Sequence, residues 1–257
     1  PYDLRRWVAA LRERRRFAGH PSIRSKDRPL SATAINNYVR GVKLLFSTLS
    51  REEIIPDHAV TRLKAPKIPK LTVRPYTEEQ LRGIFKALEQ TANPLRNRAM
   101  TALLLDSCLR LTQMATLKAE ALDLEAREIR ILGKGAKERV VPIGAWAAKQ
   151  LLLYRLKERP DSTAHELFLG SDGAPLRPHA FQQVLKRIGR RLGFRVHAHA
   201  FPHTGAILYV RNGGDPLRLQ QQLGHADLAM TRRYCAVADS DLREAHRRYS
   251  PGDRLRL

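Results

Sequence analysis

The sequence has few cysteines and no long apolar run. Its only two cysteines, Cys108 and Cys235, lie far apart and match no zinc-ligand spacing. We therefore expect two ordinary thiols in a reducing compartment. No stretch reaches the roughly 18 consecutive apolar residues of a membrane-spanning helix, and no signal peptide is recognisable. These absences predict a cytoplasmic protein without membrane contacts.

Acidic residues are also scarce relative to basic ones. Forty-seven Lys and Arg stand against 25 Asp and Glu, which gives a formal net charge of +22. A polyanion is the expected partner, because neutralising phosphates releases condensed counterions and drives binding. The charge alone fits an anionic membrane surface or an acidic protein equally well. The nine histidines form no recognisable ligand pattern with Cys or carboxylates. His199 and His203 lie four apart on one helical face, a spacing more typical of structural or phosphate-facing pairs, so we expect neither metal nor cofactor.

Residues 1–70 are predicted to form a small, basic, helical domain. Apolar residues recur at helical spacing over 2–16 and again after Ser31, a residue type that caps helices. The second helix is expected to bury Ile35, Tyr38, Val39, Val42, Leu45, Phe46 and Leu49. Its polar face fits a DNA groove or a merely solvated surface equally well. The candidate DNA contacts on this face are Asn37, Arg40 and Lys43. The proline-rich segment that follows adds Lys64, Lys67 and Lys70, and the linker over 71–76 adds Arg74.

Residues 77–257 are predicted to form a second, mainly helical domain. Thr77 and Gln80 give a capping-box pattern at its start. Further helices are expected at about 95–109, 145–158, 178–192, 201–212, 215–223, 227–237 and 239–248. Two short strands, 128–132 and 138–143, are expected to form a β-hairpin with Lys134 at its tip. The predicted fold class is therefore mainly α with a small β-hairpin or sheet.

Tyr234 is the candidate nucleophile of a metal-free reaction on DNA. A free tyrosine has a pKa of about 10, so its hydroxyl attacks poorly unless neighbours take its proton or stabilise the resulting charge. Attack on a phosphodiester adds negative charge to the non-bridging oxygens, which guanidinium and imidazole donors can meet. Arg110, His199 and His225 suit that role. Lys134, on a hairpin tip, suits protonation of the departing 5′ oxygen.

The order of these residues resembles the tyrosine recombinase (phage integrase) family. Residues 105–117, Leu-Asp-Ser-Cys-Leu-Arg-Leu-Thr-Gln-Met-Ala-Thr-Leu, are similar to its first box, and 133–139, Gly-Lys-Gly-Ala-Lys-Glu-Arg, to its hairpin segment. The second box, usually His-x-Leu-Arg-His-Thr, corresponds to His-Ala-Phe-Pro-His-Thr at 199–204. The match continues through residues 211–215 and 222–234, the last of which is Tyr234. Residues 241–251 are similar to the C-terminal tails of the family. The resemblance is strong over residues 76–257 and moderate over 30–70.

The resemblance implies a two-domain, C-shaped clamp around double-stranded DNA, with a helical core-binding domain and a tyrosine recombinase catalytic domain. Tyr234 would form a 3′-phosphotyrosine and release a 5′ hydroxyl, with Arg110, Lys134, His199 and His225 as the other catalytic residues. Family members act as four protomers on two DNA sites, so the resemblance implies a homotetramer on DNA, associated with the nucleoid in a prokaryote. The helix at 239–248 would pass to a neighbouring protomer or pack on its own domain.

The chain departs from the family pattern at its second arginine. Pro202 stands there, and proline neither donates a hydrogen bond nor carries charge. The position has lost its catalytic role in a degenerate protein, was substituted deliberately, or is compensated by another cation such as Arg195 or Arg232. Gly205, where an aromatic is frequent, and Gln113, where glutamate is frequent, are milder departures.

Three functions are therefore compatible with the sequence. The first is a site-specific DNA recombinase or integrase of a mobile element, whose activity is impaired because Pro202 replaces the second catalytic arginine. The second is a type IB topoisomerase, which uses similar residues. The third is a catalytically inactive, recombinase-like DNA-binding protein, which Pro202 motivates.

Overall fold

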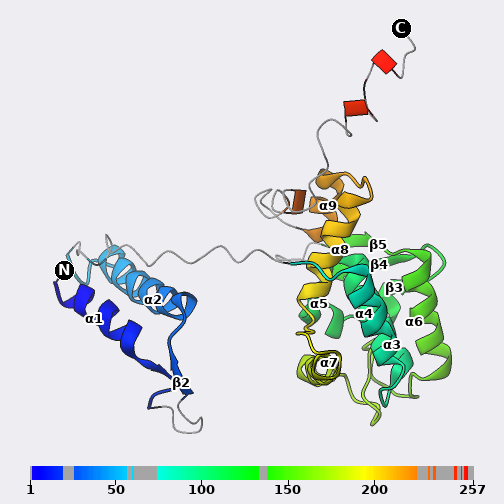
Figure 1. The fold of residues 1–257 in the computed structure, drawn as a ribbon, viewed down its shortest axis with the longest axis horizontal. Helices are drawn as coiled ribbons and strands as arrows, with labels where there is room; N and C mark the ends of the chain where they lie inside the picture. The colour runs from blue at the N-terminus through cyan, green and yellow to red at the C-terminus, as the bar shows by residue number, and fades with distance from the viewer. Residues whose placement is uncertain are drawn as a thin grey trace. The chain divides into compact units, whose positions relative to one another are not determined.

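The computed structural model describes residues 2–19, 26–56, 60, 74–132, 138–224, 231, 234, 235, 246, 247, 250, 252 and 253. The chain divides into two units, Pro1–Thr72 and Val73–Leu257 (Figure 1). Both the mainly helical fold class and the two-domain organisation are confirmed. No helix within the described residues is long and apolar enough to cross a membrane.

Two helices and a short ribbon build the first unit. Helix α1 spans Tyr2–Glu13 and helix α2 spans Ala32–Arg51. Strands β1 (Arg15–Arg16) and β2 (Lys26–Pro29) pair antiparallel between them. Helix α2 begins where its sequence predicts, because the Ser31 side chain accepts a hydrogen bond from the Ala34 backbone N–H at 3.2 Å.

The core of this unit is smaller than the sequence pattern predicts. Leu11 of α1 packs with Ile35 and Val39 of α2, and these are the buried residues of the cluster. Tyr38 and Leu45, both expected in the interior, are 50% and 56% exposed. The physical reason is that, among the described residues of this unit, one short helix and a two-stranded ribbon cover one side of α2. The first helix also ends at Glu13 instead of residue 16, because the chain turns there into β1, which the sequence did not indicate.

The second unit is built around one central helix. Helices α3 (Glu78–Leu88), α6 (Ala145–Lys157) and α8 (Ala200–Arg211) all pack against α4 (Pro94–Ser107). Other helices of this unit are α5 (Leu111–Ala115), the 3-10 turn η2 (Ala119–Ala121), α7 (Pro178–Leu192) and α9 (Pro216–Leu223). The capping box at Thr77 and Gln80 is formed, with N···O distances of 3.0 and 3.1 Å.

A three-stranded antiparallel sheet lies beside these helices. Its strands are β3 (Leu122–Asp123), β4 (Glu128–Leu132) and β5 (Glu138–Pro142), in the order β3-β4-β5. The β4–β5 pair is the predicted hairpin, whereas β3 is too short for its sequence to have predicted it. The register sets Ile129 opposite Val141 and Ile131 opposite Arg139.

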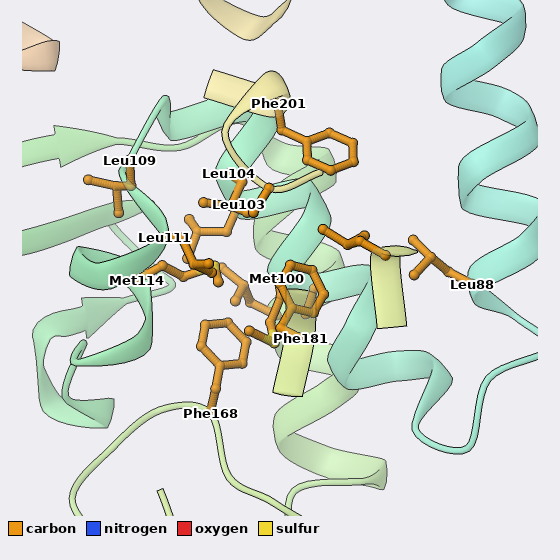
Figure 2. Packing of buried hydrophobic residues seen from close by; sticks show 14 of the residues in the cluster. Leu88, Met100, Leu103, Leu104, Leu109, Leu111, Met114, Phe168, Phe181 and Phe201 are labelled. Atoms are coloured by element: carbon orange, nitrogen blue, oxygen red, sulfur yellow. The ribbon is translucent and has the colours of Figure 1, made fainter. Parts of the chain in front are cut away.

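The hydrophobic core of the second unit surrounds α4. Figure 2 shows Met100, Leu103 and Leu104 close to Phe181 of α7 and Phe201 of α8. Helix α4 is buried on nearly every side, so its polar groups need partners inside the protein. The Arg96 guanidinium donates to the Leu169 carbonyl at 2.9 Å. The Glu158 carboxylate accepts from the Arg96 backbone N–H at 2.6 Å and so caps the first turn of α4.

Candidate active site

A sharp corner between α4 and α5 presents Arg110. Cys108 adopts a left-handed conformation with φ of +57° and ends α4. Arg110 follows as the N-cap of α5, with its side chain exposed. Its backbone N–H donates to the Gln113 side-chain oxygen at 3.2 Å. Gln113, a departure from the family pattern, therefore still performs a helix-capping function.

Helix α9 holds this corner in place. The Gln222 side-chain amide lies 3.4 Å from the Asp106 carbonyl oxygen and 3.5 Å from that of Ser107, to which it donates. Asp215 begins α9 and accepts from the Leu217 backbone N–H at 2.6 Å. The contact brings Leu223 and Gly224, which follow Gln222, toward the corner that carries Arg110.

Tyr76 fixes the start of α8, which carries the second box. Its backbone N–H donates to the buried Thr204 hydroxyl at 3.0 Å, and its ring lies 5.2 Å from that of Phe201. The Tyr76 hydroxyl accepts from the His197 backbone N–H at 3.1 Å. Burial raises the pKa of Tyr76, so this hydroxyl stays neutral and acts as a structural link.

The hydroxyl of Tyr234 lies against α8. Its oxygen is 2.8 Å from Nδ1 of His203, and the two ring centroids are 5.8 Å apart. Tyr234 is only 5% exposed and packs with Cys108, Ala206, Ile207, Leu219 and Leu223. The tyrosine ring therefore lies beside the α4–α5 corner, and Cys108 of that corner is two residues from Arg110. His203 was not among the residues predicted for the site, although its position in the second box pointed to it.

Pro202 is accommodated without disrupting α8. It is the third residue of the helix, whose N–H has no intrahelical acceptor, so the missing donor costs no helical hydrogen bond. His199 precedes the helix as its N-cap and is exposed. Pro202 therefore removes a charge from the second box while leaving the fold of α8 intact.

Gly205 allows α8 to approach α4 closely. A Cβ atom at this position would lie 1.8 Å from the Leu105 carbonyl oxygen and 3.1 Å from the Cys108 sulfur. No side chain fits there, which explains why this chain lacks the aromatic residue that is frequent in the family. The close approach also brings His203 near the α4–α5 corner.

Of the two cations proposed to replace the missing arginine, Arg195 is described and Arg232 is not. Arg195 precedes α8, and its carbonyl oxygen accepts a hydrogen bond from the Tyr76 hydroxyl at 3.4 Å. Burial, and then the charge of Arg195, lower the pKa of His197. Arg232, like the catalytic candidates Lys134 and His225, lies outside the described residues.

The candidate DNA contacts are only partly described. Asn37 and Arg40 are exposed on α2 and Lys43 is half-buried, while Arg74 is exposed. Lys64, Lys67 and Lys70 lie outside the described residues, as do most residues of the helices expected at 227–237 and 239–248. Within the described ranges, no three His, Cys, Asp or Glu side chains are grouped as metal ligands would be.

The sequence pattern of the phage integrase family matches residues 75–241. The chain belongs to this family. Tyrosine recombinase XerC of Actinobacillus pleuropneumoniae is 33% identical over 215 residues, which cover 82% of this chain and 70% of that protein. Tyrosine recombinase XerD of Vibrio cholerae is 28% identical over 245 residues, which cover 91% of this chain and 81% of the relative.

Solved structures share the fold of this family member. The integrase of transposon Tn1549 in complex with transposon right end DNA has a TM-score of 0.75 at 19% identity, with 100% of this chain and 85% of that chain covered. The XerH site-specific recombinase bound to a palindromic difH substrate has a TM-score of 0.68 at 22% identity, with 87% and 68% covered. At these identities the likeness establishes the fold.

Proposed function

We propose that this chain is a site-specific DNA recombinase that cuts and rejoins DNA through a 3′-phosphotyrosine at Tyr234. The observation that carries the proposal is the 2.8 Å contact between the Tyr234 hydroxyl and His203 Nδ1, next to the corner that presents Arg110. A nucleophile within hydrogen-bond reach of a base is the arrangement that covalent catalysis requires. Family membership and relatives named tyrosine recombinases support the same function.

The chemistry divides among side chains of several elements. In the tautomer with an unprotonated Nδ1, His203 accepts the phenolic proton while the Tyr234 oxygen attacks phosphorus. The bond from phosphorus to the 5′ oxygen breaks, and Lys134 protonates that oxygen. Arg110, together with His199 and His225, stabilises the charge on the non-bridging oxygens, so the proposed reaction uses no metal. A 5′ hydroxyl from a partner strand reverses the step and conserves the bond energy.

The proposed substrate is double-stranded DNA, and we propose that both units of the chain contribute contacts to it. The formal charge of +22 supports a polyanionic partner. The second helix would contribute Asn37, Arg40 and Lys43, and the segment between the units would contribute Lys64, Lys67, Lys70 and Arg74. We further propose that four protomers assemble on two DNA sites, in the cytoplasm and on the nucleoid of a prokaryote, and that the reaction serves a mobile element.

Pro202 supports one other function, a recombinase-like protein that binds DNA without cutting it. Loss of one charge-stabilising donor costs on the order of 10²-fold to 10³-fold in rate. Such a loss slows the reaction without removing Tyr234 or the base beside it. We therefore favour a slow enzyme over a pure binding protein.

A covalent-trapping assay separates these functions. The target duplex is first selected by the protein from a random-sequence pool, then nicked so that cleavage releases a short fragment and traps the adduct. We expect a slow adduct with this chain, none with Tyr234→Phe, and a faster one with Pro202→Arg. Saturated binding without adduct in both this chain and Pro202→Arg would identify a binding protein. Relaxation of supercoiled DNA lacking the selected site would instead indicate a topoisomerase.

A further inference from the structure

Arg139 occupies a position in β5 where the strand pattern calls for an apolar side chain. Residues two apart in a strand share a face, so Arg139 lies on the same face as Val141, which is fully buried. Its cross-strand neighbour Ile131 is also buried, at 6% exposure. Val140, on the opposite face, is 51% exposed. The strand therefore turns a guanidinium inward and a valine outward, the reverse of what burial energy favours.

The described part of the structure does not compensate the charge of Arg139. Its Nε atom is buried and has no hydrogen-bond partner there. Burial, and then the nearby charge of Arg110, lower the pKa of Arg139. A partly buried cation next to a second cation is costly, because neither desolvation nor repulsion is offset by an acceptor. Such an arrangement needs an anion, or it reduces stability without benefit.

The position of Arg139 indicates which anion it binds. A Cβ atom at Gly224 would lie 1.6 Å from the Arg139 Nη1 atom, so the guanidinium lies directly against the glycine of the Leu-Gly-His segment. Gly224 also has a φ of +64°, which glycine adopts without strain. Helix α9, whose C-cap is Gly224, is tied through Gln222 to the corner that presents Arg110. Arg139 thus contacts Gly224 and lies close enough to Arg110 for the two charges to interact.

We propose that Arg139 contacts the scissile phosphate together with Arg110 and supplies the second guanidinium that Pro202 removes from the second box. The proposal rests on the function proposed above, because it assigns a further catalytic residue to the same reaction. Two guanidinium groups meet the oxygens of one phosphate well, since each offers a planar pair of donors. The phosphate also supplies a counter-charge that none of the described residues gives to Arg139.

The test compares Arg139→Met, Arg139→Lys and a control, Arg155→Met, on the exposed face of α6. In the nicked-duplex assay, Arg139→Met should slow adduct formation on the order of 10²-fold to 10³-fold. Arg139→Lys should recover part of the rate, and Arg155→Met should leave it unchanged. Equal rates for Arg139→Met and the control would overturn the proposal.

Two further measurements do not depend on cleavage. If Arg139 binds a DNA phosphate, Arg139→Met should reduce the slope of log affinity for the selected duplex against log salt by about 0.9. An unchanged slope contradicts the proposal. In the free protein, Arg139→Met should keep or raise the unfolding temperature, because it removes a partly buried cation that none of the described residues neutralises. A lower unfolding temperature would show a structural role and contradict the proposal.

Failure of this inference is distinguishable from failure of the proposed function. Absence of any Tyr234-dependent adduct refutes the enzyme, while the salt slope still decides whether Arg139 binds phosphate. A normal adduct in Arg139→Met leaves the enzyme intact and refutes only the role of Arg139.

Discussion

Replacement of Gly205 by alanine should destabilise the second unit. The new Cβ atom would lie 1.8 Å from the Leu105 carbonyl oxygen, whereas real Cβ contacts essentially never fall under 3.0 Å, so α8 must move by more than 1 Å from α4. The obstacle is the backbone of a central helix, which cannot rotate away as a side chain can. Overpacking of this kind costs about 1 to 3 kcal/mol or more. For a domain of this size the unfolding temperature should fall by about 2 to 12 °C.

Gly83 provides the matched control for this prediction. It also lies within a helix, α3, but a Cβ atom there meets only the Leu192 Cδ2 atom, at 4.0 Å. Gly83→Ala gains the same helix propensity without a clash and should stabilise the protein by about 0.5 to 1 kcal/mol. Thermal unfolding followed by circular dichroism measures both variants. A Gly205→Ala protein as stable as Gly83→Ala would refute the close approach of α8 to α4.

Other predictions concern the site and its surroundings. His203→Phe keeps a ring beside Tyr234 but removes the proton acceptor, so adduct formation in a single turnover should slow on the order of 10²-fold; an unchanged rate means that another group is the base. The pKa of His197 is lower in the folded protein than the value of about 6.5 expected in the unfolded chain, so folding favours the neutral imidazole. The contribution of His197 to stability is therefore complete above about pH 6.5 and is lost as the pH falls toward the pKa of the folded state. Between about pH 7.5 and 5.5, the free energy of unfolding measured in urea should therefore fall less for His197→Gln than for the parent protein. Equal falls would contradict a lowered pKa of His197. Burial raises the pKa of Cys108 to about 12, so iodoacetamide at about pH 8 should label this thiol only after unfolding, as peptide mass spectrometry will show.

The helices were largely predictable because their signals are local. The Ser31 cap, the Thr77 capping box and the Asp215 cap each lie at a predicted helix start, and each is formed. The strands β1 and β3 were not predicted, since two residues are too few to show an alternating pattern. The exposure of Tyr38 was not predictable either, because it depends on how little of the first unit covers α2.

The candidate site was predictable only as far as its motifs. The family resemblance pointed to Arg110, His199 and Tyr234, but it could not show which group touches the Tyr234 hydroxyl. The contact with His203 depends on the packing of a distant segment against α8. Arg139 was missed for a related reason. Glu-Arg-Val-Val alternates poorly, and only the register with Ile131 shows that the arginine faces inward.

The central claim is that the Tyr234 oxygen becomes covalently linked to DNA. The most direct test digests the adduct trapped on the nicked duplex and locates the attached nucleotide by mass spectrometry. The account predicts one modified peptide, with a 3′-phosphate joined to Tyr234. Linkage at any other residue, or full occupancy of the duplex without linkage even in Pro202→Arg, would contradict it.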